Sequence, residues 1–447
     1  MLKDKTLCAV DLGAESGRVL WGRFDGRTLQ AQDIHRFANR PVCLGGTLTW
    51  NILSLYDEIL QGLGKIHETS SQPISTVGVD AWGVDFGLLD AQGQLVGLPV
   101  HYRDRRTNGL IEEVTGRIPA EEIFAATGIA FWPFNTLYQL YAVARERPHL
   151  LRDDSTLLFI PDLLHYWLCG ARVSERSIAS TSQCLALSED RWEGSLLSPL
   201  GIPTSIFPEV VPSGTILGDL TPYVREQTGL SGVQVITPAS HDTASTVVAT
   251  PLSSPDAAYL SCGTWSLLGI ESLTPLTTHE ALQTGFSNEK GIGRSYCILR
   301  NIMGHWLLQQ VRKVWAKRHQ QYEYAEMAAR AREAPAFQAW VDPNDSRFLA
   351  PTDMVTAVQG FCADRGQSVP ESMPEITRCL LESLAFAYRQ AIEQLETMTG
   401  RKIPCLHLTG GGVNNRVLCQ WTANALQRPV IAGPEVVSSL LLLILLL

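Results

Sequence analysis

The chain has 447 residues, of which 45% are hydrophobic and 18% charged, and its formal net charge is −9. A chain of this length is too long for one hydrophobic core and predicts two domains of about 200 residues each. The net charge is negative and the sequence has no cluster of basic residues, which disfavours nucleic acid as a partner. The ten cysteines are scattered and form no C-x-x-C pair, which disfavours a structural zinc site.

The first residues, 1–5, contain no apolar core of a secretory signal. The sequence therefore predicts a cytoplasmic protein whose cysteines are reduced and serve mostly as small core residues.

The first predicted elements are three hairpin-connected strands, a helix and a further strand parallel to the first. They cover residues 7–11, 18–24, 28–37, 53–67 and 75–80. Asp25-Gly26 between two apolar-patterned runs is a hairpin signal, and the helix follows from apolar residues at spacings of three and four between Leu55 and Ile66. This order of elements is the start of a ribonuclease H-like layer.

The turn between the first two strands is rich in glycine and small residues and follows directly after Asp11. Such a turn lets backbone N–H groups approach an anion closely, so we interpret residues 11–18 as a phosphate site. Asp11 would hold a divalent cation beside the phosphate, and Arg18 would offset the charge of the transferred group. Neither common glycine fingerprint for nucleotides fits this turn, and an ordinary hairpin with a surface arginine is the alternative.

Residues 80–86 combine a tryptophan and a glycine with two carboxylates, those of Asp80 and Asp85. A sugar packs its C–H face on an aromatic ring and its hydroxyls on carboxylates, so this segment is a candidate sugar site. The alternative is that Trp82 is a plain core aromatic. The charged run at residues 101–107 is a solvated loop by default, or it faces a cleft and binds substrate oxygens through an arginine.

Residues 240–245, Ser-His-Asp-Thr-Ala-Ser, form the candidate catalytic segment. Phosphoryl transfer needs position, a cation and a carboxylate that accepts the proton of the attacking alcohol, and Asp242 would be that carboxylate. His241 and Thr243 would hydrogen-bond sugar hydroxyls on either side of it. The alternative role of Asp242 is to cap a helix that starts at Thr243, and both roles are compatible because a helix N-terminus also favours anions.

A proline- and serine-rich break at residues 251–256 divides the chain into an N-terminal domain, residues 1–250, and a C-terminal domain, residues 251–434. The second half repeats the plan of the first, with a hairpin over 259–269 whose Gly-Thr turn is a second candidate phosphate site. Two such hairpins, one in each half, indicate a nucleotide clamp with two lobes.

The rest of the second half predicts two helices, a strand and a third helix. The first two are indicated by the stripe Met303, Leu307, Val311 and Trp315 and by the apolar face of residues 374–399. A strand at 406–409 leads into three glycines, 410–412, before a helix that begins near Asn415. Because glycines present no side chain, the base or ribose of a nucleotide can lie on their backbone.

Residues 435–447 form an atypical leucine-rich tail that ends in eight consecutive aliphatic residues. A membrane-spanning helix needs about 20 apolar residues, so the tail does not predict a membrane anchor. As a surface helix it would expose apolar side chains on all sides, so it does not match a normal domain ending either.

Taken together, six of these segments resemble the FGGY carbohydrate kinases. They are residues 11–18, 82–86, 102–107, 240–243, 263–266 and 410–412. The resemblance covers about residues 6–434 and implies an α/β chain with the actin-like, ribonuclease H-like ATPase fold, in which two duplicated domains surround a central cleft. It implies ATP and Mg²⁺ as cofactors. The partners would be a small-molecule sugar and ATP, with no nucleic acid, membrane or obligate protein partner.

The residues that match the motifs of the family take roles by this resemblance. Asp242 would be the proton acceptor, and Asp11 would lie close to the metal. The substrate contacts would be Gly83, His241, Asp242, Thr243 and Asn301. The nucleotide contacts would be Ala14, Glu15, Ser16, Gly17, Arg18, Thr264, Gln309 and Gly411.

Residues 134–140, 301–304 and 342–348 narrow the resemblance to the branch of the family that phosphorylates L-rhamnulose on its 1-hydroxyl. The alternatives are a kinase of another ketose or polyol such as L-fuculose, L-xylulose or glycerol, an actin- or chaperone-like ATPase, and an inactive truncated remnant. A kinase needs Asp242 and a sugar pocket in the cleft. An ATPase that drives a partner needs neither, and it usually carries an appended domain.

The sequence departs from the family at two places. Glu15 stands where the family has a small polar residue, which adds a carboxylate near the phosphate site. After residue 434 the family continues with a Gly-Asn pair and a helix, so the tail predicts a truncated C-terminal domain with bare core surface and lower stability. Cys362 and Cys379 fall where the family has a cysteine pair, and the expected cytoplasmic setting favours thiols.

Overall fold

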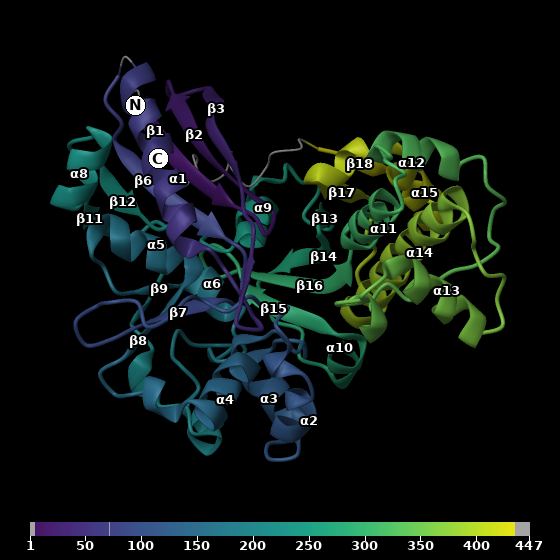
Figure 1. Ribbon diagram of the computed structural model, residues 1–447, viewed down its shortest axis with the longest axis horizontal. Coiled ribbons are helices and arrows are strands. Elements are labelled where there is room, and N and C mark those ends of the chain that lie inside the picture. Colours follow the sequence, from purple (N-terminus) through teal and green to yellow (C-terminus); the bar gives the residue numbers. More distant parts are fainter. Residues whose placement is uncertain (1–4, 71, 434–447) are drawn as a thin grey trace.

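A computed structural model of the chain describes residues 5–70 and 72–433 (Figure 1). The leucine-rich tail at 435–447, and with it the expected truncation, lies outside the described residues. The described chain forms two lobes, each built on a six-stranded sheet.

The first lobe contains the elements up to α9. They are β1 (Lys5–Leu12), β2 (Ser16–Phe24), β3 (Leu29–Ala38), β4 (Val42–Leu44), β5 (Thr47–Thr49), α1 (Ile52–Thr69), β6 (Thr76–Ala81), β7 (Phe86–Leu89), α2 (Leu110–Thr115), α3 (Ala120–Thr127), α4 (Thr136–Glu146), β8 (Thr156–Phe159), α5 (Ile160–Cys169), β9 (Ser174–Glu175), α6 (Arg176–Ser180), α7 (Gly194–Leu197), β10 (Val210–Val211), β11 (Ile216–Asp219), α8 (Pro222–Thr228), β12 (Gln234–Ile236) and α9 (Asp242–Ala249).

The second lobe contains the remaining elements. They are β13 (Ala258–Cys262), β14 (Trp265–Ser272), α10 (His279–Thr284), β15 (Phe286–Lys290), β16 (Tyr296–Met303), α11 (Trp306–Lys317), α12 (Tyr324–Ala331), α13 (Met354–Asp364), α14 (Met373–Thr399), β17 (Leu406–Thr409), α15 (Arg416–Leu426) and β18 (Val430–Ala432).

The two sheets share the arrangement of their central strands. The first has the order β11-β12-β6-β1-β2-β3 and the second has the order β15-β16-β14-β13-β17-β18. In each, an antiparallel meander continues into a parallel strand, because β1 pairs with β2 antiparallel and with β6 parallel, and β13 pairs in the same way with β14 and β17. The outer strands differ, because β11 pairs antiparallel with β12 whereas β18 pairs parallel with β17. The predicted repeat of element order is therefore confirmed for the central strands.

Local signals explain most of the element boundaries. β1 is buried along almost its whole length, as a central strand with both faces covered should be. Helix α14 begins at a capping box, in which Ser372 and Glu375 exchange side-chain and backbone hydrogen bonds, and it ends at Gly400 with φ +67°. The sequence pattern predicted both the first strand and this long helix to within two residues at each end.

One part of the predicted helical stripe is wrong. Met303 is the last residue of β16, where it pairs with Trp265, and α11 begins only at Trp306. The chain turns at Gly304 between the two elements, since the N–H of Gly304 donates to the carbonyl of Thr264. Met303 and Leu307 are fully buried in the same core. Because Met303 lies four positions before Leu307, its burial is compatible with a helix as well as with a strand that precedes the helix.

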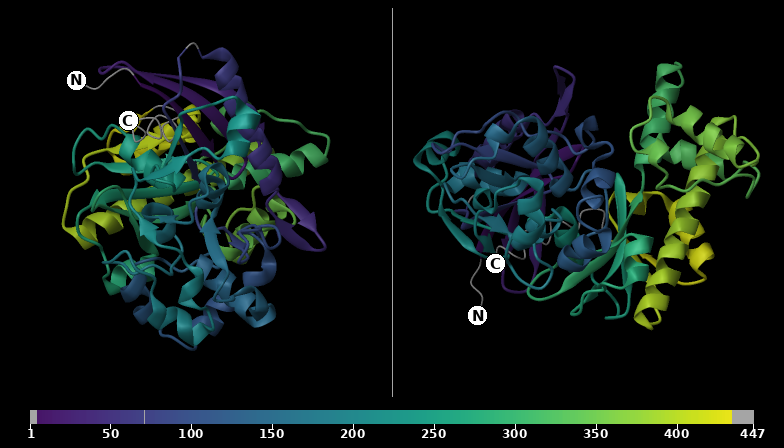
Figure 2. Two further views of the ribbon diagram at one scale, coloured as in Figure 1. Left: turned by 90° about the vertical axis from the view of Figure 1, so that its left-hand side faces the viewer. Right: turned by 90° about the horizontal axis from the view of Figure 1, so that it is seen from below.

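Each lobe has its own hydrophobic core. One core lies around β1, β6 and α1 in the first lobe, and another fills the second lobe between its sheet and the long helix α14. A further cluster forms around α2 and α4, the part of the first lobe below β7 and β8 in Figure 1. The right-hand view of Figure 2 shows that the helices α11–α15, green to yellow, gather on the second lobe, away from the first sheet.

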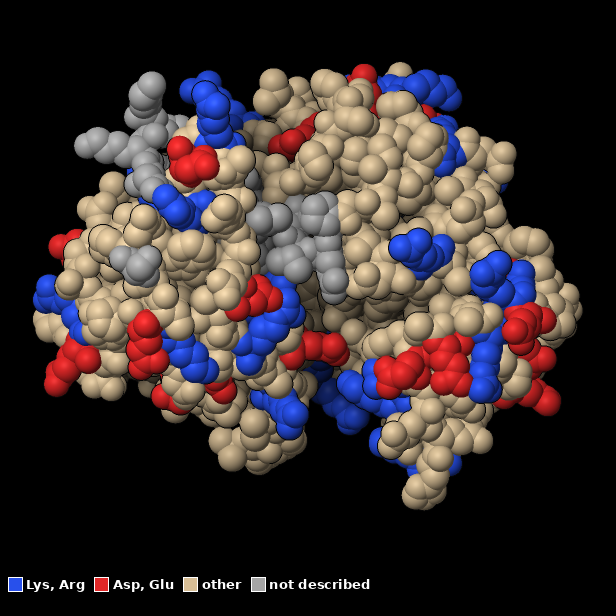
Figure 3. Space-filling view, turned by 90° about the horizontal axis from the view of Figure 1, so that it is seen from above, with Lys and Arg blue, Asp and Glu red and all other residues tan. Residues whose placement is uncertain are grey.

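Charged side chains on the surface and the cysteines follow no special pattern. On the face shown in Figure 3, acidic and basic side chains of the described residues lie interspersed. All ten cysteines are free thiols, and the Cys362 and Cys379 side chains lie within hydrogen-bond reach of each other. Within residues 5–70 and 72–433, none of the helices is both long and apolar enough to cross a membrane.

Candidate functional site

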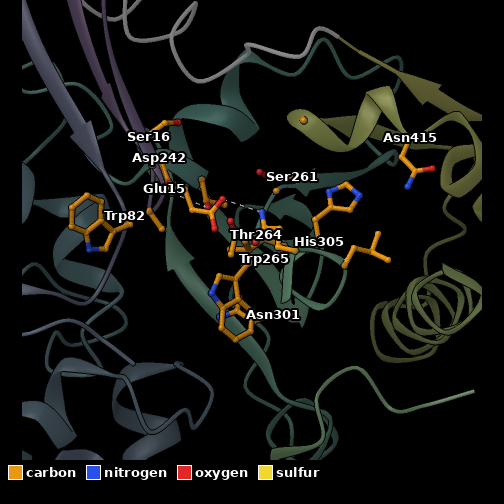
Figure 4. A pocket seen from close by; sticks show the side chains of 18 of the residues that line it. Glu15, Ser16, Trp82, Asp242, Ser261, Thr264, Trp265, Asn301, His305 and Asn415 are labelled. Atoms are coloured by element: carbon orange, nitrogen blue, oxygen red, sulfur yellow. Dashed lines mark hydrogen bonds between the residues drawn. The ribbon is translucent and has the colours of Figure 1, made fainter. Parts of the chain in front are cut away.

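A cavity of about 960 Å³ lies between the two lobes and receives residues from both (Figure 4). Most of the residues singled out from the sequence line it: Ala14, Glu15, Ser16, Gly83, His241, Asp242, Thr243, Thr264, Asn301, Gln309 and Gly411. Three others, Asp11, Gly17 and Arg18, lie behind the first turn and do not line it. Segments more than 200 residues apart in sequence therefore meet at one site.

The two predicted phosphate turns face each other across this cavity. In the first, the N–H of Gly13 donates to the carbonyl of Ser16 at 2.9 Å, and Asn39 Nδ2 donates to the carbonyl of Gly13 at 3.0 Å. In the second, the N–H of Gly263 donates to the carbonyl of Trp265 at 2.8 Å. Each turn is thus held by its own backbone and presents small residues to the cavity.

Asp11 and Arg18 form an ion pair at the base of the first turn. Arg18 donates to Asp11 Oδ2 from Nη2 at 2.7 Å and from Nε at 3.0 Å, across the β1–β2 pair. Asp11 also lies beside Asp80 in the parallel β1–β6 register. Burial and the negative charges of Asp11 and Asp242 raise the pKa of Asp80 well above its usual value.

Asp242 is the first residue of α9 and lies in the cavity at the junction of the lobes. The residue before it, His241, is the N-cap, so the expectation that Asp242 caps a helix starting at Thr243 is wrong by one position. The Thr243 hydroxyl donates to Asp242 Oδ1 at 3.2 Å. Burial and the charge of Asp11 raise the pKa of Asp242 to about 6, although His241 acts in the opposite direction.

His241 lies between two carboxylates. Its Nε2 is 3.5 Å from Asp242 Oδ1, and its Nδ1 is 3.0 Å from Oε2 of Glu289, a residue of β15. Burial alone would lower the pKa of His241, but the nearby carboxylates of Glu289, Asp242 and Glu175 outweigh burial and raise it.

The buried carboxylate of Glu175 holds the candidate catalytic segment, residues 240–245, in place. It caps α6 by accepting from the N–H groups of Ser177 and Ile178, and it also accepts from the N–H of Ser240 at 3.0 Å. The Ser177 hydroxyl in turn accepts from the N–H of His241 at 3.1 Å. Sequence reasoning missed Glu175 because it lies 65 positions before Ser240 and carries no local signal of this contact.

Asp85 organises the aromatic wall of the cavity. Its carboxylate accepts from Trp50 Nε1 at 2.6 Å, from Trp82 Nε1 at 3.1 Å, from the N–H of Tyr102 at 3.1 Å and from Gln139 Nε2 at 2.9 Å. Trp82 packs on Trp50 with ring centroids 4.1 Å apart and still lines the cavity, so it is both a core residue and a cavity residue. Asp80 and Asp85 are fully buried and do not line the cavity, so the interpretation that they bind sugar hydroxyls is wrong.

The backbone after Trp82 is strained where it meets the cavity. Val84 has φ +69°, which is rare for a β-branched residue. Its N–H donates to Thr181 Oγ1 at 3.1 Å, and its carbonyl accepts from Thr136 Oγ1 at 2.7 Å. A Cβ on Gly83 would lie only 3.1 Å from the Thr181 side chain, so glycine suits this close approach.

A second aromatic group closes the cavity beside Asn301. Trp132 and Phe134 stack with centroids 5.3 Å apart, and Trp265 meets both edge-on at 5.5 Å. Asn301 Oδ1 is buried and has no hydrogen-bond partner among the described residues. Apolar ring faces and an unused acceptor are suited to a polyhydroxylated ligand.

The charged run at 101–107 joins the lobes and is not a solvated loop. The guanidinium of Arg103 lies 3.9 Å from the ring centroid of Trp306 and 5.2 Å from that of Trp265, both in the second lobe. Its Nη1 donates to the carbonyl of Leu349 at 2.7 Å. Arg106 donates to Gln139 Oε1 at 2.6 Å inside the first lobe, so neither arginine lines the cavity.

The candidate nucleotide side is formed by the second lobe. Gly411 lines the cavity and has no atom within 4 Å of a Cβ built on it, whereas a Cβ on Gly412 would lie 2.3 Å from Cys262 Sγ. Asn415 caps α15 by accepting from the N–H of Leu418 at 3.0 Å, as predicted. Gln309 Nε2 donates to Glu15 Oε2 at 3.1 Å across the lobes.

Comparison with known proteins identifies what the chain is similar to. Residues 6–249 match the N-terminal domain of the FGGY family of carbohydrate kinases, and residues 258–441 match the C-terminal domain of the same family. The chain is 43% identical over 438 residues to the rhamnulokinase of Pectobacterium atrosepticum, covering 98% of this chain and 86% of that protein. It is also 43% identical over 438 residues to the rhamnulokinase of Enterococcus faecalis, covering 97% of this chain and 87% of that protein.

A solved structure supports the fold. The gluconate kinase of Lactobacillus acidophilus superposes with a TM-score of 0.80 at 15% sequence identity, covering 99% of this chain and 89% of that chain. At this identity the likeness concerns the fold alone. It agrees with the actin-like arrangement of two similar lobes around a cleft that the sequence predicted.

Proposed function

The chain belongs to the FGGY family of carbohydrate kinases, and we propose that it transfers the terminal phosphoryl group of ATP to the 1-hydroxyl of L-rhamnulose. The products are L-rhamnulose 1-phosphate and ADP. The sugar is inferred from relatives that carry the name rhamnulokinase and are 43% identical over almost the whole chain. The observation that carries the chemistry is Asp242, a cavity carboxylate with a pKa of about 6 between the two turns.

In the proposed reaction Asp242 is the general base. Above pH 6 it is mostly ionised, so it accepts the proton of the sugar hydroxyl while the oxygen attacks the terminal phosphorus. His241 and Thr243 hydrogen-bond the sugar on either side, and Gly83 lets it approach the backbone beside Trp82. Asn301 offers its unpartnered Oδ1 from the opposite lobe.

The nucleotide lies across the second lobe in this proposal, with its phosphates between the two turns. Residues 14–16, which line the cavity, hold the terminal phosphate through backbone N–H groups, with Thr264 on the other lobe. Gly17 and Arg18 support this turn from behind. Gln309 and Gly411 contact the rest of the nucleotide.

Mg²⁺ is the metal that the reaction requires, and Asp11 would hold it. Among the described residues no group of three or more His, Cys, Asp or Glu side chains is arranged as a metal site. The fit is supported by the charges around Asp11: burial, and after it the negative charges of Asp11 and Asp242, raise the pKa of Asp80, and a cation held at Asp11 would offset those charges. When bound, the ion would supply positive charge to the phosphates.

The proposal is tested by an assay of ADP release with L-rhamnulose, L-fuculose, L-xylulose and glycerol, on the wild type and on Asp242→Asn. We expect the highest kcat/KM with L-rhamnulose and a loss of about 10³-fold in kcat for the variant. A maximum with glycerol would refute the choice of sugar. Hydrolysis of ATP that needs no sugar and survives Asp242→Asn would refute the kinase.

A further inference from the structure

Strand β15 belongs to the second sheet but is bonded to the first lobe. The N–H of Ala130 donates to Ser287 Oγ at 3.0 Å, and the N–H of Asn288 donates to the carbonyl of Gly128 at 2.8 Å. The N–H of Lys290 donates to Ser180 Oγ at 2.9 Å. Residues on both sides of Glu289 are therefore fixed to the lobe that carries His241, and Glu289 has little freedom to move relative to it.

Glu289 presents its carboxylate to the buried side of His241. Oε2 lies 3.0 Å from Nδ1, and the two side chains are only 8% and 7% exposed. Neither atom has a hydrogen-bond partner among the described residues, so this ion pair is the contact that the two atoms make. The opposite ring nitrogen, Nε2, lies 3.5 Å from Asp242 Oδ1. The imidazole is therefore held from one side by β15 and faces the proposed base with the other.

We propose that Glu289 is a positioning residue for phosphoryl transfer: it keeps the proton of His241 on Nδ1 and holds the ring so that Nε2 stays beside Asp242. A carboxylate on one imidazole nitrogen generally fixes the tautomer and orientation of the ring. This inference rests on the proposed function, because it assigns to Glu289 an effect on the base named there. Neither the sequence motifs nor the resemblance singled out Glu289.

The charges around His241 determine the expected effect. The groups that face it are Asp242 on α9, Glu289 on β15 and Glu175 on β9, and Asp11 on β1 and Asp80 on β6 lie near Asp242. Glu289→Gln removes one negative charge, so His241 is less often protonated. Because the charge of His241 lowers the pKa of Asp242, that pKa rises in the variant and the acidic limb of the pH profile moves to higher pH.

The test compares Glu289→Gln with Glu289→Asp and with the control Glu271→Gln. Glu271 is matched because it lies on β14 of the same sheet and, like Glu289, pairs with Cys297 of β16, but it does not line the cavity. We expect Glu289→Gln to lower kcat at least tenfold, to change the KM for ATP less than threefold and to shift the acidic limb upward. Glu289→Asp should restore the position of that limb in part, and Glu271→Gln should behave as the wild type.

A second measurement does not depend on turnover. The ¹⁵N chemical shifts of the His241 ring report which of its nitrogens carry a proton. We expect Nδ1 to keep its proton in the wild type, and we expect the second proton, on Nε2, to be lost at a lower pH in Glu289→Gln, where the tautomer of the neutral ring is also mixed. An unchanged ring together with an unchanged pH profile would overturn the inference, and so would a lower kcat with both of these unchanged. If the wild type does not phosphorylate any sugar, the proposed function fails while the ring shifts still decide whether Glu289 sets the tautomer.

Discussion

The carboxylate of Asp242 links activity to stability through one pKa. Because its pKa is about 6 in the unliganded protein, we expect kcat/KM for the sugar to decrease as the pH falls below about 6, where the proposed base becomes protonated. A pH–rate profile of the wild type between pH 5 and pH 9 measures this. A rate that stays constant down to pH 5 would contradict the assignment of Asp242 as the base.

The raised pKa of Asp242 also affects folding, and at neutral pH it makes the folded protein less stable. The folded protein binds the Asp242 proton more tightly than the unfolded chain, whose value is near 3.8, so this group lowers the free energy of unfolding as the pH rises from about 4 through 6. The variant Asp242→Asn has no ionisable group at this position, so its free energy of unfolding does not fall in this way. We expect it to be more stable than the wild type by about 1 kcal/mol at pH 7.5 and no more stable at pH 4. Urea unfolding at the two pH values gives the comparison.

Glu15 places a negative charge in the turn that is proposed to hold phosphate. Glu15→Gln keeps an acceptor for Gln309 Nε2 and removes the charge, so we expect the KM for ATP to fall about threefold at low salt. The difference should shrink in 0.5 M NaCl, because exposed charges are then screened. An increase in KM would instead indicate that the carboxylate itself helps to bind the nucleotide, through the metal.

The strand–turn segment around Asp85 shows how one buried group supports a whole wall of the cavity. Removing the carboxylate in Asp85→Ala leaves the indole N–H groups of Trp50 and Trp82 without an acceptor. We expect a loss of about 3 kcal/mol in the free energy of unfolding and a higher KM for the sugar. Asp57→Ala on the exposed side of α1 is the control, and equal effects of the two variants would refute this role.

Elements with local signals could be predicted from the sequence, and contacts between distant elements could not. The hairpins, α14 and the strand β17 follow from turn residues, caps and apolar spacing within a few positions. Asp242 could be found because its neighbours form a recognisable segment. Glu289 and Glu175 could not, because their contacts to residues 240–241 span 48 and 65 positions of sequence and depend on how the sheets are placed.

Arg103 makes several of the contacts that join the two lobes. Its guanidinium packs on Trp306 and Trp265 and donates to the carbonyl of Leu349. Arg103→Lys keeps the charge but loses the planar group that stacks on the rings. We expect the KM for the sugar to rise about fivefold, with little change in melting temperature.

Small-angle scattering provides a direct measurement of this contact. The radius of gyration with sugar and a non-hydrolysable ATP analogue should be larger in Arg103→Lys than in the wild type. Arg105→Lys, two positions away on an exposed side chain, is the matched control. A variant that compacts as fully as the wild type would show that Arg103 does not hold the lobes together.

The attachment of β15 to the first lobe has a consequence for recombining genes of this family. A crossover at residue 250 joins the complete N-terminal half of one parent to the complete C-terminal half of another. It nevertheless separates β15 from its partners at Gly128, Ala130 and Ser180. Hybrids cut there would combine contact surfaces that had not been selected together, at the strand beside His241. Hybrids that also take residues 286–290 from the parent of the first lobe keep donor and acceptor of each of these bonds in one parent, and such hybrids should more often be active.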